Sequence, residues 1–113
     1  MSSDNQVWDN LNTAVVISDP DFNVTYANKR AFDLFDELKI PGLAIGSNMH
    51  SCHKPETMVI LKKLYQDFAD KKIKLNHLTM DVPDGIITIV NVPSYNGDAL
   101  ESVVEMVFEG PLG

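Results

Sequence analysis

The sequence predicts an α+β fold in which helices pack on one face of a five-stranded antiparallel sheet. The prediction rests on the order of the segments: two short extended segments, then helical segments, then three alternating segments separated by turn residues. When strands and helices are segregated along a chain in this way, the helices cover one face of an antiparallel sheet. The 113 residues suffice for one such domain and not for two.

The chain opens with a predicted short helix, whose cap is Ser3 or Asp4. Val7, Trp8 and Leu11 follow at spacings that favour this helix. Trp8 has two interpretations that the sequence leaves open: it packs onto the domain's own sheet, or it forms part of a dimer contact. The chain therefore divides into a cap helix, a main domain and a tail, at residues 1–12, 13–109 and 110–113.

The first two strands are predicted to form a hairpin. Residues 14–17 are rich in β-branched side chains, and residues 24–26 resume the extended pattern. Between them, Pro20 and Asp21 are turn residues because proline presets φ and aspartate bonds to the nearby backbone. Asn28 then caps a helix. The apolar face of this helix consists of Ala31, Phe32, Leu34 and Phe35.

The middle of the chain is predicted to be helical. In residues 40–46 we expect short, irregular helical turns, because Pro41, Gly42 and Gly46 interrupt an apolar run. Pro55 then occupies the first turn of the longest predicted helix, where proline is tolerated. The apolar face of that helix consists of Met58, Leu61, Leu64, Tyr65 and Phe68.

Three strands are predicted after this helix. Residues 74–82 alternate between two faces, and residues 83–85 form a hairpin turn that leads to a strand over residues 86–92. A second turn over residues 94–99 leads to the last strand, residues 102–108. We expect the first hairpin to lie beside these last strands, which makes five strands in one sheet.

Composition argues against nucleic acids, membranes and secretion. The formal net charge is −7, and the basic residues form no stripe, so phosphate backbones would be repelled. No apolar run approaches the ~18 residues of a bilayer span, and the polar N-terminus lacks the pattern of a secretory signal. Cys52 is the single cysteine, which fits a reducing compartment. We therefore expect a cytoplasmic protein that binds neither nucleic acid nor membrane.

Two stretches resemble the PAS family of sensor domains. The segment AVVISDPDFNVTYANKRAFDLF contains a strand, a D-x-x-x-x-V turn, a strand, an asparagine and a helix ending in phenylalanine. This order resembles the opening of a PAS domain, with Asn28 at the family's common asparagine. From Gly46 to Pro55 the chain reads G-x-x-x-x-x-C-H-x-P, and a helix ending in D-F-x-x-x-K follows. This second pattern is similar to a PAS subgroup that often accompanies hemerythrin-like domains in bacterial and archaeal proteins, although Glu56 replaces that subgroup's second proline.

The resemblance extends from Leu11 to Phe108 and implies a function. PAS domains are sensors and dimerisation modules rather than enzymes, and they bind a small molecule, haem, flavin or nothing between the sheet and the helices. Their signal usually leaves through the last strand, often by a D-I-T sequence that leads into a linker helix. Here residues 108–111 read FEGP, which cannot start a regular helix. We therefore expect the output domain or partner protein to lie outside this sequence, and the resemblance implies a homodimer.

The first candidate ligand site precedes the long helix, where Met49, His50, Cys52 and His53 gather. His50 and His53 are three residues apart, so a helical turn would place them on one side. Imidazole and sulfur ligands suit haem iron or zinc, and His53 is the best candidate for a metal ligand. The alternative, which we favour, is structural: His53 caps the helix or bonds to the backbone, and Cys52 packs as a small apolar side chain.

Two further cofactor classes are disfavoured around Cys52. Light-sensing flavin PAS domains carry an arginine and a glutamine in their cysteine motif, and neither has a counterpart here, so we expect no flavin. No C-x-x-C or C-x-x-C-H motif is present, so a structural zinc site or a covalent haem lacks support.

A second candidate site involves polar residues of the last strands. His77 and Thr79 share one face of their strand, and with Asn91 from the next strand they could point into a pocket. Tyr26 could join them. Leu78 and Met80 occupy the opposite face, and only one face of an alternating strand is buried. These two apolar residues favour the alternative in which His77 faces solvent.

Enzymatic chemistry is not expected. Asp19 and Asp21 are paired carboxylates, but they fall in a predicted turn and serve solvation. Cys52 and His53 are adjacent in sequence, which does not by itself create a nucleophile with its base and orienting group. The prediction is a sensory module that binds a small ligand or cofactor, dimerises, or does both. The alternatives are a cofactor-free homodimerisation domain and a haem-based or metal-based redox or gas sensor.

Overall fold

The computed structural model describes residues 6–51 and 53–112, and this part of the chain contains three α-helices and one 3-10 turn. The helical elements are α1 (Gln6–Asn10), α2 (Lys29–Glu37), the 3-10 turn η2 (Met49–Ser51) and α3 (Pro55–Ala69). The predicted caps of the first helix, Ser3 and Asp4, lie outside the described residues. Asn28 caps α2 and Pro55 opens α3, as predicted.

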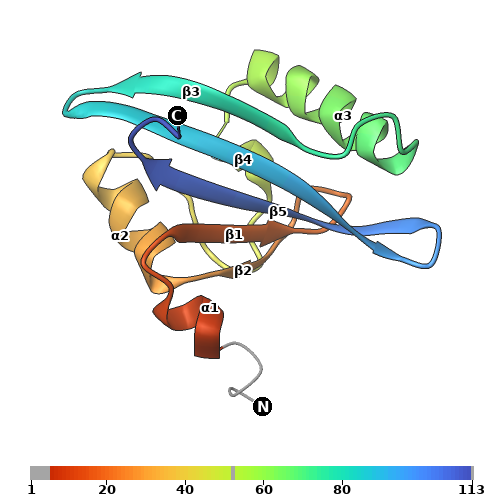
Figure 1. The fold of residues 1–113 in the computed structure, drawn as a ribbon, viewed down its shortest axis with the longest axis horizontal. Coiled ribbons are helices and arrows are strands. Elements are labelled where there is room, and N and C mark those ends of the chain that lie inside the picture. The colour runs from red at the N-terminus through yellow and green to blue at the C-terminus, as the bar shows by residue number, and fades with distance from the viewer. Residues whose placement is uncertain (1–5, 52, 113) are drawn as a thin grey trace.

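The strands form one antiparallel sheet with the spatial order β2-β1-β5-β4-β3 (Figure 1). Their bounds are β1 Ala14–Ser18, β2 Val24–Ala27, β3 Asn76–Val82, β4 Gly85–Asn96 and β5 Ala99–Glu109. The first hairpin therefore lies beside the last strand, which confirms the predicted α+β fold.

The last two strands are longer than predicted. The predicted turn over residues 94–99 shrinks to Gly97 and Asp98, because Asn96 and Ala99 still pair across it. A register shift between Ser94 and Tyr95 bends this ladder. The resulting β4–β5 hairpin projects beyond the other strands (Figure 1).

The core lies between one face of the sheet and the helices. Pairing sets this inner face: Ala14 pairs with Val107, which pairs with Ile89, and the cross-strand partners in such a row share a face. Val103 and Val107 on β5 are 1% and 3% exposed, which shows that odd-numbered positions between residues 103 and 107 point inward. The helices contribute Ala31, Leu34, Met58, Tyr65 and Phe68 to the same core.

Residues 40–46 do not form the predicted helical turns. The described structure has no regular element there, and Gly42 and Gly46 have φ values of 94° and 92°, which a right-handed helix does not allow. The segment instead bonds to β2: the amide of Val24 donates to the carbonyl of Ser47, and the amide of Gly46 donates to the carbonyl of Val24, both at 2.7 Å. The prediction failed because glycine permits these conformations and β2 offers backbone partners.

No helix among the described residues combines the length and the apolar character needed to cross a lipid bilayer.

Candidate functional site

A cavity of about 550 Å³ lies between the inner face of the sheet and the helices. This volume falls within the range of about 300–1,000 Å³ that is typical of small-molecule pockets. Its helical side consists of Phe35, Leu38, Ile40, His53, Lys54 and Thr57. Its sheet side consists of Met80, Asp81, Val82, Pro83, Ile87, Ile89, Glu105 and Val107.

The cavity wall is mostly apolar, and its polar groups are few. Phe35 and Leu38 come from α2, and Ile87 and Ile89 come from β4. Among the described residues, the charged or titratable members of the wall are His53, Lys54, Asp81 and Glu105, of which Asp81 is exposed and alternates with the inward Met80. An apolar wall with a few polar groups is the usual arrangement of a ligand pocket.

Glu105 is the notable polar residue of this wall. It lies on β5 between Val103 and Val107 and shares their inward face. The register places it opposite Val16 on β1 and Asn91 on β4. Burial raises the pKa of the Glu105 carboxyl to about 7, because the surroundings disfavour the ionised form. No hydrogen bond or ion pair between this carboxyl and another described residue is present in residues 6–51 and 53–112.

Sequence reasoning missed Glu105, although a signal was available. The last strand alternates, and Val103, Glu105 and Val107 occupy one face of it. A lone carboxylate between two inward valines is an ionisable group at a core position, which is unusual for glutamate. Such a residue is a candidate for a functional site when it also lines a cavity.

The structure separates the residues that gather before α3. Met49 is buried, with its sulfur 3.6 Å from the hydroxyl of Tyr65. His50 is exposed, and its Nδ1 lies 2.5 Å from Oδ1 of Asn48. His53 lines the cavity, and its Nδ1 lies 2.9 Å from the carbonyl oxygen of Met49. Cys52 lies outside the described residues.

The expectation that His50 and His53 share one side is therefore wrong. The 3-10 turn ends at Ser51, before His53, so no continuous helical turn joins the two histidines. Within the described part of the chain, no three His, Cys, Asp or Glu side chains form a group that could hold a metal ion. His53 bonds to the backbone, which is the structural role that the sequence favoured.

The residues of the cavity wall also indicate whether a haem could bind there. The Nδ1 contact of His53 with a carbonyl oxygen is an arrangement that metal-binding histidines use. The rest of the wall does not suit a porphyrin with its two propionates. Lys54 is the one lysine or arginine among the described lining residues, so two propionates would have a single permanent cation to pair with, and Glu105 is acidic. The residues present therefore do not fit haem well.

Of the polar strand residues, Asn91 lies on the inner face and His77 does not. Asn91 is 6% exposed, and its Oδ1 accepts a hydrogen bond from Nδ2 of Asn76 at 3.2 Å. His77 pairs with Val90 on the opposite face and is exposed. Leu78 and Met80 take the inward positions, because they pair with Ile89 and Ile87. The placement of His77 in a pocket is thus corrected in favour of its alternative, and neither His77 nor Asn91 lines the cavity.

Tyr26 is also absent from the cavity wall. Its hydroxyl donates to the carboxylate of Asp9 in α1. Burial and the interaction with Asp9 raise the pKa of Tyr26 to about 12. Tyr26 therefore ties α1 to the edge strand β2.

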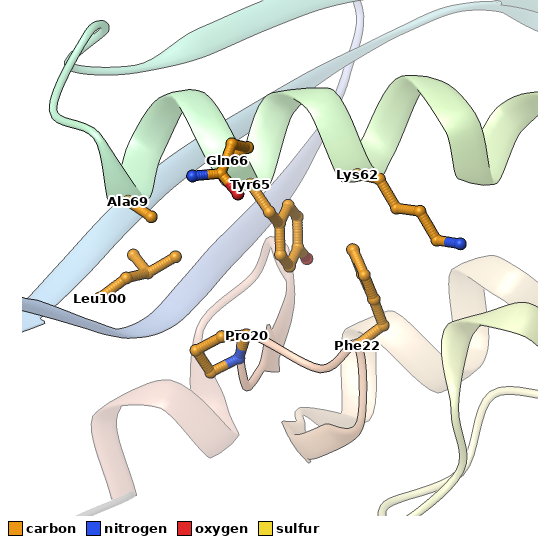
Figure 2. A pocket seen from close by; sticks show the side chains of 7 residues that line it. All are labelled: Pro20, Phe22, Lys62, Tyr65, Gln66, Ala69 and Leu100. Carbon is orange, nitrogen blue, oxygen red and sulfur yellow. The ribbon is translucent and has the colours of Figure 1, made fainter.

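A second hollow, of about 440 Å³, is an open groove beside α3. Figure 2 shows side chains of α3 on one side of it and Pro20 and Phe22 on the other. The hydroxyl of Tyr65 lies 2.6 Å from Oγ of Ser18, and the Tyr65 ring lies 4.5 Å from that of Phe22. Burial raises the pKa of Tyr65 to about 12. Tyr65 is thus engaged in packing, and the cavity beside Glu105 is the better candidate site.

A comparison with models of protein families identifies the family of this chain. A family model described as PAS domain matches residues 6–69, which is more than half of the chain. The chain therefore belongs to the PAS domain family. A comparison with curated proteins found no match.

Solved PAS structures share the fold at low sequence identity. The PAS domain of BvgS from Bordetella pertussis is 10% identical with a TM-score of 0.70, over 96% of this chain and 84% of that one. A PAS domain from Colwellia psychrerythraea is 19% identical with a TM-score of 0.66, over 96% and 94%. A sensory box sensor histidine kinase from Vibrio cholerae is 18% identical with a TM-score of 0.61, over 92% and 83%.

Proposed function

We propose that this PAS domain is a sensory module that binds a small, mostly apolar ligand in the cavity between its sheet and its helices. The observation that carries the proposal is the cavity itself, about 550 Å³ with an apolar wall and few polar groups. The likeness to a sensor histidine kinase of Vibrio cholerae supports a role in signalling.

The elements around the cavity suggest how binding would be sensed. The wall joins the last strand β5, the helix α2 and the residues that open α3. A ligand that contacts all three would favour one arrangement of helices against sheet over another, by the difference in its affinity for the two. Because β5 leads directly to the C-terminal end of the domain, a shift there would reach an output partner.

Nile red, a neutral apolar dye, offers a direct test. Ile89→Trp would fill the cavity from the sheet side. Val92→Trp is a matched control on the same strand, because Val92 pairs with Val104 on the outer face and is already 37% exposed. We expect saturable dye fluorescence with wild type and V92W, and at least a tenfold weaker affinity in I89W. Equal binding by I89W, or no binding by wild type, would overturn the proposal.

A second candidate function is homodimerisation without a ligand. It is favoured by apolar side chains outside the core: Val7 on α1 is 75% exposed, and Val92 lies on the outer face of the sheet. In this alternative, the outer face and α1 would pair two copies, and the cavity would be a packing defect.

A further inference from the structure

No hydrogen bond or ion pair to the Glu105 carboxyl is present among the described residues, and its half-buried side chain lines the cavity. Its neighbours on the inner face of β5, Val103 and Val107, are almost fully buried. The cavity wall around it contains apolar side chains of α2 and β4, such as Leu38 and Ile89. An ionised carboxylate only accepts hydrogen bonds, and in such surroundings it is costly without a donor or a cation.

The other charges around the cavity do not remove this need. Asp81 from β3 has the same sign as Glu105, and it lies on the outer face of the strand because it alternates with the inward Met80. Lys54 and His53 come from the segment that opens α3, and no ion pair between either of them and Glu105 is present among the described residues. Asn91 lies next to Glu105 in the ladder, but no hydrogen bond from its Nδ2 to the Glu105 carboxyl is present among the described residues. The wall therefore presents the Glu105 carboxylate, a hydrogen-bond acceptor without a donor among the described residues, to a ligand in the cavity.

We propose that the cavity selects ligands that join an apolar body to a cationic amine, and that Glu105 binds the amine. The proposal rests on the proposed function, because it names the class of ligand for the same cavity. The apolar body would contact Leu38, Ile87 and Ile89, and the ammonium would donate to the Glu105 carboxylate. A charge-assisted bond of this kind is stronger than a neutral one and gives specificity for the head group.

The test uses three probes that share an apolar phenylalkyl body and differ in the head group: 4-phenylbutylamine, 4-phenylbutanol and 4-phenylbutyric acid. Binding of each to the purified protein is measured by displacement of Nile red at pH 8. We expect the amine to bind about tenfold more tightly than the alcohol, and the acid to bind most weakly. In Glu105→Gln, the amine should lose this advantage while the affinity for the alcohol changes less than about twofold.

The preference for the amine over the alcohol should depend on pH. Burial raises the pKa of Glu105 to about 7, so at pH 6 the carboxyl is neutral in most protein molecules. The affinity for the amine should therefore rise from pH 6 to pH 8, while the affinity for the alcohol stays constant. His53→Gln must keep the pH dependence, and Glu105→Gln must lose it. Asp81→Asn is the control for the second acidic side chain of the wall.

The outcomes separate the two proposals. If the alcohol competes with the dye in wild type but the amine has no advantage, the amine proposal fails and ligand binding stands. If the acid binds best, Lys54 or His53 sets the selectivity and the role of Glu105 is refuted. If none of the three probes competes and I89W binds Nile red like wild type, the proposed function itself fails.

Discussion

Asn28 and Val15 bond to each other twice, although they are thirteen positions apart in the sequence. The amide of Asn28 donates to the carbonyl of Val15, and the amide of Val15 donates to Oδ1 of Asn28, both at 3.0 Å. The same Oδ1 accepts from the amide of Ala31 at 2.9 Å and so caps α2. Nδ2 of Asn28 donates to the carbonyls of Trp8 and Thr13, both at 2.9 Å. One buried side chain thus joins α1, β1 and α2.

Replacement of the Asn28 side chain should lower the free energy of unfolding. Asn28→Ala removes the cap of α2, worth about 0.5–2 kcal/mol, and leaves buried backbone groups without partners, at about 1–3 kcal/mol. We expect the free energy of unfolding to fall by about 2–4 kcal/mol in urea denaturation. Asn28→Asp keeps the acceptor and loses both donors, so its loss should come from the contacts with Trp8 and Thr13.

Asn12→Ala is the matched control, because Asn12 is exposed. It should unfold within about 0.5 kcal/mol of wild type. A loss in N28A no larger than that in N12A would show that the network around Asn28 contributes little to stability.

The sequence predicts the parts of this fold that local chemistry determines. Asn28 and Pro55 mark helix starts by a side-chain acceptor and by a fixed φ, so both could be located without tertiary contacts. Residues 40–46 could not, because their conformation depends on backbone bonds to the distant strand β2. The length of the β4–β5 hairpin was underestimated for a similar reason: pairing between strands carries it through to Gly97.

The candidate site was predicted only in part. His53 was chosen for its chemistry and does line the cavity, but its neighbour His50 turns to solvent. Spacing in sequence cannot show where a 3-10 turn ends. Glu105 belongs to no metal-ligand motif, and only the alternation of β5 places it inward.

If the domain forms a homodimer without a ligand, its mass in solution should depend on the side chains that the outer face of the sheet and α1 present. Val92→Glu places a charge on that face, and Val7→Glu places one on α1. If two copies pair there, both changes should convert a dimer to a monomer in sedimentation equilibrium, since burial of an unpaired charge is costly. Trp8→Ala should weaken the same contact.

Val59→Glu is the control for added surface charge, because Val59 on α3 is 68% exposed and lies away from the outer face of the sheet. It should leave the mass unchanged. A monomeric wild type at all protein concentrations would contradict this alternative, as would a dimer that tolerates V92E, V7E and W8A.

The cavity wall predicts that haem does not bind stoichiometrically. The described part of the wall offers one lysine and no arginine to two propionates, so addition of haemin to the purified protein should give no Soret band that depends on His53. The measurement is a visible-absorption titration with metal analysis of the same sample. A sharp band that His53→Ala abolishes and His50→Ala preserves would refute the prediction and make His53 an iron ligand.

Glu105 should also make the stability of the domain fall as pH rises. Its carboxyl has a pKa of about 7 in the folded state, against about 4.3 for an unperturbed glutamate in the unfolded chain. Between these values the folded state binds more protons than the unfolded state, so the free energy of unfolding decreases with increasing pH. The cost of the buried charge is absent below pH ~4.3 and complete above pH ~7.

Glu105→Gln removes this titration while it keeps the size of the side chain. Relative to wild type, E105Q should gain about 1–3 kcal/mol between pH 4 and pH 8, as measured by urea denaturation at both values. Glu101→Gln is the control, because Glu101 lies on the same strand and is exposed. Its difference from wild type should not change with pH. A pH-independent difference for E105Q as well would mean that the Glu105 carboxyl is solvated in the folded protein, and the cavity would then lack the unmatched acceptor on which amine selectivity depends.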